Sequence, residues 1–288
     1  MLFCEILLRN IPNEYSYKSE YLERNSNKIK VLFLGNSHIF YGINPELINH
    51  NYFNASHVAQ SLDIDFEILK KHQKNWNNLE FIVVSVDYMS LLSSLKDGPA
   101  EWRLKNYEIY YNINIRNKLT DNFEIFNGKL AKNINRIFRY YFKNERGINI
   151  NKLGWGTQLN SSNSKDLLKT GKVAAGRHAA KDSISFNKQI SNLEKIIMFA
   201  KHKKVKIILV SCPSYKTYVE NLDVKELTST IDVIKALENK YTNMKYYNLL
   251  NDKSFIDKDF FDADHLNEIG TEKFTVKMDS IIKTFKKH

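Results

Sequence analysis

The stretch Lys28–His38 reads KIKVLFLGNSH, and it decides the fold of this chain. Its apolar residues form a short continuous run, which is typical of a parallel strand buried on both faces. The polar tetrapeptide Gly35-Asn36-Ser37-His38 follows that run at once. In an open parallel sheet, ligands bind beyond the carboxyl ends of the strands. We therefore predict a central strand that ends in a polar turn at a ligand site.

Further strands and helices alternate along the rest of the chain. Strong strands are predicted at Phe81–Val86 and Val205–Val210, and shorter ones at Tyr52–Asn54 and Met244–Asn248. Segments with helical periodicity lie between them, at Ile64–His72, Asn187–Lys201, Val224–Tyr241 and Ile269–Phe285. Such alternation indicates βαβ units. We predict an α/β protein, a three-layer α/β/α sandwich with a central parallel, flavodoxin-like sheet.

The regular alternation of predicted strands and helices is lost between about residues 92 and 186. We interpret this region as a helical insertion. The insertion interrupts one α/β domain that spans residues 28–288, and residues 1–27 form an N-terminal segment. Within the insertion, Phe123–Phe142 interleaves basic with apolar and aromatic side chains. That pattern is compatible with binding to nucleic acid or to a membrane surface. It is more typical of an amphipathic helix with a solvated basic face.

The opening residues Met1–Leu8 are apolar apart from Glu5. They are far fewer than the roughly 20 apolar residues that a membrane-spanning helix needs. They also lack the layout of a signal peptide. Two interpretations stay open: the remnant of a membrane anchor, and an ordinary first helix packed on the protein.

The composition, with 43% hydrophobic and 12% aromatic residues, is that of a globular protein and excludes a disordered chain. The net charge of +11 favours anionic partners, but the lysines are spread through the chain as on a solvated surface. No nucleic-acid-binding motif is present, so we expect no nucleic-acid partner. Cys4 and Cys212 lie far apart, and no residues show metal-ligand spacing. We therefore expect no metal and no other cofactor.

Ser37 is the candidate nucleophile, because the turn exposes its hydroxyl and offers backbone N–H groups to an oxyanion. It could instead cap the following helix, which is the commoner role of serine. A serine nucleophile needs a base and an acid that orients the base. His265 and Asp262 supply both, three positions apart, just before the last predicted helix. Asp264 or Asn267 is enough to cap that helix, so capping does not explain the other two.

The tetrapeptides at positions 35–38 and 262–265 resemble blocks I and V of the SGNH, or GDSL-like, hydrolase superfamily. The similarity is greatest to the bacterial branch that modifies cell-surface polysaccharides. In that branch a Gly-x-Ser-His motif is followed by a segment like Tyr41–Pro45, and the C-terminal motif is like Asp-Ala-Asp-His-Leu-Asn. The resemblance implies an SGNH-type domain with Ser37 as nucleophile, His265 as base and Asp262 as orienting acid.

The same resemblance implies an oxyanion hole completed by a Gly after the second strand and an Asn after the third. This chain has no Gly in Asn54–Ser61, and Asp87 follows its third strand. We expect the backbone N–H groups of Ser37 and Ser56 to act as the donors. An ionised aspartate cannot donate a hydrogen bond. The departure is compatible with a relaxed oxyanion hole or with a degenerate, inactive relative.

Five further residues are candidates for substrate binding: Asn36, His38, Arg177, His178 and Tyr215. The first two flank the nucleophile. Arg177 and His178 lie in the insertion, from which they could reach over the site and bind an anionic group, or they could be surface residues. Tyr215 follows the strand that ends at Val210, and it would suit a sugar.

We predict acyl-ester chemistry on a carbohydrate, by an O-acetyltransferase or O-acetylesterase of a bacterial surface polysaccharide. The glycan comes from the resemblance, because fold and triad do not choose a substrate. The resemblance also favours the cell envelope, with membrane association through the N-terminus or a membrane-bound acyl donor protein. Two alternatives stay open: a catalytically degenerate carbohydrate-binding protein, and a basic nucleic-acid-binding protein whose binding would depend steeply on salt.

Overall fold

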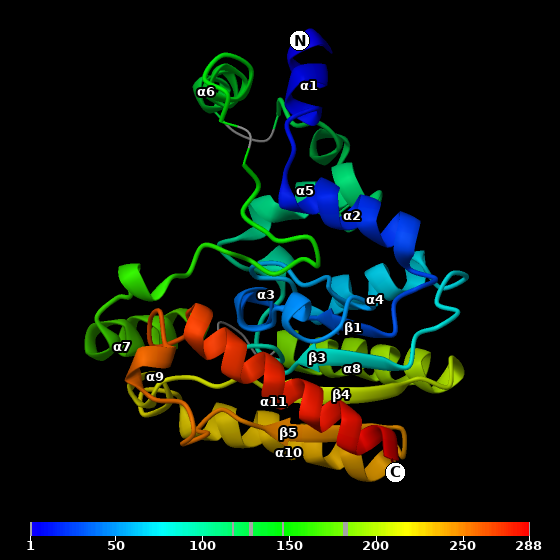
Figure 1. Cartoon of the computed structure of the whole chain (residues 1–288), viewed down its shortest axis with the longest axis vertical. Coiled ribbons are helices and arrows are strands. Elements are labelled where there is room, and N and C mark those ends of the chain that lie inside the picture. The colour runs from blue at the N-terminus through cyan, green and yellow to red at the C-terminus, as the bar shows by residue number, and fades with distance from the viewer. Residues whose placement is uncertain (1, 117, 127–128, 146, 181–183, 288) are drawn as a thin grey trace. The chain divides into compact units, whose positions relative to one another are not determined.

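The computed structural model describes residues 2–116, 118–126, 129–145, 147–180 and 184–287 (Figure 1). The chain forms two compact units. Unit 1 comprises Met1–Ser26 and Leu95–Asn149, and unit 2 comprises Asn27–Ser94 and Ile150–His288. No helix in the described part of the chain is both long and apolar enough to cross a membrane.

Unit 2 is built on a five-stranded sheet. Its strands are β1 (Val31–Leu34), β2 (Tyr52–Asn54), β3 (Phe81–Ser85), β4 (Lys206–Ser211) and β5 (Met244–Asn248). The order is β2-β1-β3-β4-β5, and every neighbouring pair is parallel. All residues of β1 and β3 are buried, and all but Ser85 at the end of β3 are apolar, as expected for strands covered on both faces.

Helices cover both faces of this sheet (Figure 1). The helices of unit 2 are α3 (Ser37–Gly42), α4 (Leu62–Lys71), α7 (Leu167–His178), α8 (Ile184–His202), α9 (Lys216–Val219), α10 (Val224–Lys240) and α11 (Glu268–Lys287), with 3-10 turns at Pro45–Leu47, Ser161–Asn163 and Asp257–Asp259. Phe33 and Val83 point to the face where Phe274 and Met278 of α11 complete one apolar core. Helices α4 and α8 pack against each other, and α8 also contacts β4. The predicted three-layer α/β/α sandwich is confirmed.

Unit 1 is helical. It contains α1 (Leu2–Arg9), α2 (Glu14–Asn25), α5 (Leu104–Tyr111) and α6 (Leu130–Tyr141), with 3-10 turns at Leu95–Asp97, Glu101–Arg103 and Leu119–Asn122. Buried tyrosines join α2 to α5: the ring of Tyr15 meets Tyr107 edge to face at 5.3 Å, and Tyr107 lies 5.6 Å from Tyr111. Nearby, the buried carboxylate of Glu124 pairs with Lys105 at 3.1 Å and Arg136 at 2.9 Å.

The structure groups the chain differently from the sequence-based division. The N-terminal segment belongs with residues 95–149, whereas residues 150–186 belong to the α/β unit. Backbone hydrogen bonds explain the second assignment, because the Asn54 N–H donates to the Leu153 carbonyl and the Gly156 N–H donates to the Phe40 carbonyl, both at 2.9 Å. Helix α6 begins at Leu130 rather than at Phe123, and residues 127–128 lie outside the described part.

Candidate active site

The turn after β1 requires glycine at position 35. Gly35 has a φ of +118°, and a Cβ there would lie 2.1 Å from the Ser85 hydroxyl oxygen. A side chain is therefore excluded both by the backbone conformation and by space. The Gly35 N–H donates to Asp65 at 3.0 Å, and the next N–H donates to Ser85 at 3.3 Å. These contacts turn the chain sharply, so that Ser37 becomes the first residue of α3.

Asn36 fixes this turn rather than facing a substrate. Its side-chain oxygen accepts the His38 N–H at 2.9 Å, which caps α3, and its amide nitrogen donates to Asp87 at 3.1 Å. The Ser37 N–H has no acceptor among the residues that the structure describes. That group is therefore available to a ligand beside the Ser37 hydroxyl.

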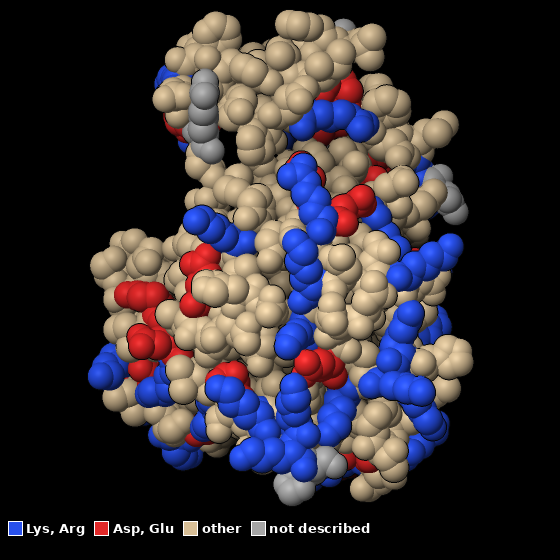
Figure 2. Space-filling model, turned by 45° about the vertical axis from the view of Figure 1, so that its right-hand side comes forward, with Lys and Arg blue, Asp and Glu red and all other residues tan. Residues whose placement is uncertain are grey.

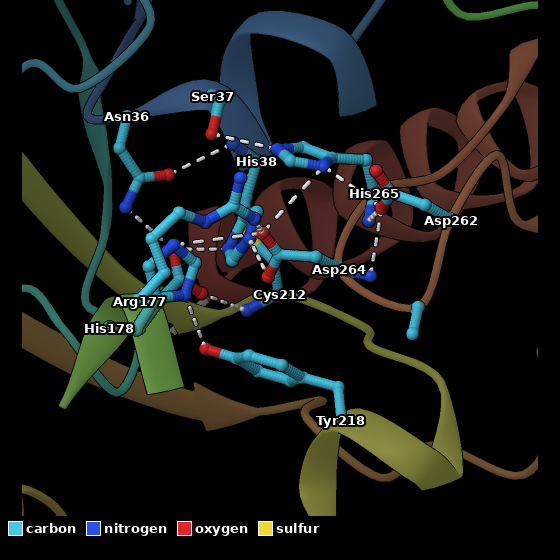
Figure 3. A network of polar contacts seen from close by, with 12 residues as sticks. Asn36, Ser37, His38, Arg177, His178, Cys212, Tyr218, Asp262, Asp264 and His265 are labelled. Atoms are coloured by element: carbon cyan, nitrogen blue, oxygen red, sulfur yellow. Dashed lines mark hydrogen bonds and ion pairs between the residues drawn. The ribbon is translucent and has the colours of Figure 1, made fainter. Parts of the chain in front are cut away.

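Ser37, His265 and Asp262 form a continuous hydrogen-bonded chain (Figure 3). The Nε2 atom of His265 lies 2.9 Å from the Ser37 Oγ, and its Nδ1 lies 3.0 Å from the Asp262 Oδ1. Burial of Asp262 favours its neutral form, but the His265 ring and the backbone N–H donors together outweigh burial and lower the Asp262 pKa. An ionised Asp262 thus fixes the Nδ1–H tautomer, which leaves Nε2 free to accept the proton of Ser37.

A short loop before α11 holds this pair of residues. The Asp262 Oδ1 also accepts the backbone N–H groups of Asp264 at 2.9 Å and His265 at 2.8 Å. Asn267 caps α11, because its side-chain oxygen accepts the N–H groups of Ile269 at 3.0 Å and Gly270 at 3.1 Å. Of the two capping residues considered from sequence, Asn267 is the one used, so both aspartates are free for other contacts.

His38 lies buried between two carboxylates. Its Nδ1 is 3.0 Å from the Asp87 Oδ2, and its Nε2 is 3.0 Å from the Asp264 Oδ1. Burial opposes protonation of His38, but the two carboxylates outweigh it and raise the His38 pKa well above its usual value. The ring is therefore a buried cation with 2% of its side chain exposed. Both ring nitrogens face protein carboxylates, and the contact of His38 with substrate stays a prediction.

Asp87 occupies the place where the family resemblance implies an asparagine. Its Oδ1 accepts the Cys212 N–H at 2.7 Å, and its Oδ2 faces Asn36 and His38. Burial favours the neutral acid, yet the His38 cation outweighs it and lowers the Asp87 pKa. Asp87 thus anchors the turn as a buried anion and offers no donor to an oxyanion.

Asp264 connects the triad to α7 (Figure 3). Its Oδ2 lies 3.6 Å from the Arg177 guanidinium, 3.7 Å from the His178 Nε2 and 3.7 Å from the His265 Nδ1. Burial opposes its ionisation, but the neighbouring rings of His265, His38 and His178 together outweigh that effect and hold the Asp264 pKa well below its usual value. A second carboxylate therefore faces His265 besides Asp262.

The structure places Arg177 and His178 beside Asp264, and their role in substrate binding stays a prediction. The Arg177 side chain is 56% exposed, so its guanidinium can reach a ligand. His178 is mostly buried, and its Nδ1 lies 2.9 Å from the Tyr218 hydroxyl. Burial lowers the His178 pKa to about 4, so the ring is neutral near pH 7. Sequence reasoning missed Tyr218 and the network role of Asp264, for which no local motif gives a signal.

Two predicted residues serve the core instead. The N–H of the fully buried Ser56 donates to the Asn54 side-chain oxygen at 3.2 Å, so it does not serve as the second oxyanion donor. Tyr215 is buried, and its ring packs edge to face on Phe260 at 5.5 Å. Its N–H donates to the Ala263 carbonyl at 3.0 Å. Tyr215 therefore supports the loop of the site rather than lining a sugar pocket.

Two groups of side chains have the closeness of metal ligands: His38, Asp264 and His265, and His38, Asp87 and Cys212. Both include His38, whose two ring nitrogens are already held by carboxylates. The buried charges in these groups thus compensate one another without an ion. The absence of a metal stays a prediction.

Comparisons with known proteins add likenesses of fold. No family model and no curated protein matches the sequence. Among solved structures, one provisionally described as a platelet activating factor from Streptococcus pneumoniae shows 12% identity and a TM-score of 0.49 over 93% of this chain and 90% of that one. A GDSL-like lipase from Bacteroides thetaiotaomicron shows 12% identity and a TM-score of 0.44, over 94% of this chain and 98% of that one. A provisionally described acylhydrolase from Bacteroides fragilis shows 10% identity and a TM-score of 0.42, over 92% of this chain and 95% of that one.

Proposed function

We propose that unit 2 is a serine esterase or O-acyltransferase of SGNH type. The observation that carries this proposal is the chain Ser37–His265–Asp262, with contacts of 2.9 and 3.0 Å. These are hydrogen-bond distances for a nucleophile and its base, and for the base and the acid that orients it. The motif resemblance at positions 35–38 and 262–265 assigns the same roles to the same residues.

In the proposed reaction, the Ser37 Oγ attacks the ester carbonyl carbon while the His265 Nε2 takes the hydroxyl proton. The carbonyl π electrons move onto oxygen, and the Ser37 N–H donates to that oxyanion. Collapse expels the alcohol, which takes the proton back from His265 and leaves an acyl-Ser37. Water or a sugar hydroxyl then attacks this ester, with His265 again moving the proton. The reaction needs no cofactor.

The substrate in this proposal is an O-acetylated carbohydrate of a bacterial cell envelope. Support comes from the motif resemblance and from the exposed Arg177 guanidinium, which lies beside the triad and suits an anionic glycan. Partner and location follow the same reasoning: a polysaccharide or its precursor as acceptor, and an acyl ester or a membrane-bound acyl donor protein as donor.

The first test measures hydrolysis of p-nitrophenyl acetate by the full chain and by Ser37→Ala, His265→Ala and Ser162→Ala. Removing either triad residue should lower kcat by about 10³-fold or more, because members of a triad act as a unit. Ser162 is exposed and lies outside the site, so its variant is the matched control. Rates that are unchanged in all three variants would refute the serine mechanism. Acetate release from an O-acetylated polysaccharide then tests the substrate class separately.

A separate observation favours a second candidate function, that of a glycan-binding protein without catalytic activity. Asp87 accepts a hydrogen bond from Cys212, and the Ser56 N–H donates to Asn54. The Ser37 N–H is therefore the one donor that we assign to the proposed oxyanion hole. Loss of one donor costs about 10²–10³ in kcat in serine hydrolases. Glycan binding without turnover, unaffected by Ser37→Ala, would favour this candidate.

A further inference from the structure

Helix α6 of unit 1 turns its apolar side outward. Leu130, Ile134 and Phe138 recur every fourth position, so they share one side of the helix. All are exposed, Ile134 by 54% and Phe138 by 48%. Phe142, also exposed, extends this face, and its ring stacks on Phe138 at 5.4 Å. An amphipathic helix of a globular domain normally buries this side, so the arrangement is inverted.

The polar side of α6 holds the helix to unit 1. The buried Asn133 amide donates to the Ile125 carbonyl at 3.2 Å, and Arg136 pairs with the buried Glu124 at 2.9 Å. The same side borders a cavity of about 710 Å³ rather than a packed apolar core. Polar contacts therefore fix the orientation of α6, and its apolar residues contribute little to the folding of the unit.

Helix α1 shows the same inversion beside it. Leu2, Phe3 and Ile6 are exposed, whereas the buried Glu5 carboxylate accepts the N–H groups of Glu124 at 3.1 Å and Ile125 at 2.9 Å. The two helices are in contact, and the Tyr141 hydroxyl of α6 donates to the Leu7 carbonyl of α1 at 3.1 Å. Figure 1 shows α1 and α6 at one end of unit 1, and the same end in Figure 2 is mostly free of charged side chains.

Basic residues accompany this apolar face. Residues 129–143 include Lys129, Lys132, Arg136, Arg139 and Lys143, and no acidic residue. The first two lysines are exposed, and the Lys143 ammonium lies 5.7 Å from the Phe138 ring centre. Arg136 pairs with Glu124 and Arg139 with Glu145, so the lysines carry the charge that remains. A helix with lysine and arginine on its polar face and large apolar residues on the other is the pattern of helices that lie in the interface of a bilayer. The charges complement anionic headgroups, each contributing most within a Debye length of the surface.

We propose that the exposed face of α1 and α6 binds the surface of an anionic phospholipid bilayer, with both helices lying along the interface. Leu130, Ile134, Phe138 and Phe142 of the α6 region and Leu2, Phe3 and Ile6 of α1 enter the headgroup boundary. Lys143, which lies beside the Phe138 ring, stays with the lipid phosphates. None of these residues belongs to the Ser37 site, so the inference does not depend on the proposed acyl chemistry.

The test is flotation of the full chain with vesicles of phosphatidylcholine alone and with vesicles of equal parts phosphatidylcholine and phosphatidylglycerol. The chain should float with the anionic vesicles, and the double variant Ile134→Ser/Phe138→Ser should bind at least about tenfold more weakly, because two large apolar groups no longer leave water. The matched control is Val173→Ser/Val224→Ser, which replaces two exposed apolar residues of unit 2 and should bind like the original chain. Circular dichroism checks that all variants fold.

Two further experiments test the contribution of the lysine charges and the alternative that this face binds a second copy of the chain. Lys132→Gln/Lys143→Gln should weaken binding severalfold at low salt and by less at high salt, since salt screens surface charge. Equal binding of the original chain and the Ile134/Phe138 variant, or no binding to anionic vesicles, would overturn the proposal. Light scattering that shows a dimer abolished by the same double variant, without vesicle binding, would assign the face to a second copy of the chain instead.

Discussion

Both units of this protein bury charged side chains, but in unit 1 this burial accompanies an exposed apolar helix face. In unit 2, charged groups are buried around Ser37, where His38 lies between Asp87 and Asp264 at 3.0 Å from each. In unit 1, α6 turns polar groups inward and leaves Ile134 and Phe138 exposed. Buried charge is tolerated when the charges compensate one another, and exposed apolar surface often marks a binding site. Each departure from ordinary patterning thus coincides with a candidate site.

Replacing the buried cation should produce the largest loss of stability. His38→Leu leaves Asp87 and Asp264 buried without their partner, which should cost about 3–5 kcal/mol of unfolding free energy. The measurement is urea unfolding, compared with His50→Leu at an exposed position, which should lie within about 0.5 kcal/mol of the original chain. A His38→Leu variant as stable as the control would show that these carboxylates do not depend on His38.

A pair of isoleucines tests the comparison between the units directly. Ile208→Ala removes buried groups in β4 and should cost about 2–5 kcal/mol, because a cavity is left in the core. Ile134→Ala in α6 should change stability by about 0.5 kcal/mol or less, because the side chain is already exposed. A cost above 2 kcal/mol at Ile134 would mean that its side chain is buried in the folded protein.

The smallest expected effect is a dependence on pH. The His38 pKa is raised by folding, so its stabilisation is complete below its ordinary value of 6.5 and is lost as the pH rises towards the folded pKa. The pKa values of Asp87 and Asp264 are lowered, so their stabilisation is complete above 3.8 and is lost as the pH falls. The stability difference between the original chain and His38→Leu should therefore be greatest between about pH 4 and 6.5. A difference that grows from pH 6.5 to 8 would contradict a charged His38.

The strands of the sheet and the candidate triad residues could be predicted from the sequence, whereas the residues that surround the triad could not. Continuous apolar runs such as Phe81–Val86 mark buried parallel strands, and the motif containing His265 assigned the base. The burial of His38 depends on Asp264, 226 positions away, and no local pattern encodes such a contact. No pattern in the sequence indicates that the Asn54 side chain accepts the Ser56 N–H, which was expected to face an oxyanion.

The orientation of α6 could not be predicted from its sequence either. Periodicity shows that Phe123–Phe142 includes an amphipathic helix, but it does not say which side faces the protein. That choice depends on the acceptors offered by Glu124 and Ile125, outside the helix. The pairing of the N-terminal segment with residues 95–149 likewise rests on contacts such as Tyr15 with Tyr107, which are far apart in sequence.

The most direct test of the central claim is the intact mass of the protein after brief exposure to p-nitrophenyl acetate, followed by peptide mapping. The account predicts one acetyl group on Ser37, absent from Ser37→Ala and strongly reduced in His265→Ala. It also predicts that Ser162→Ala is labelled like the original chain, because that serine lies outside the site. An unlabelled original chain, or an acetyl group that persists at another residue in Ser37→Ala, would contradict a nucleophilic role for Ser37.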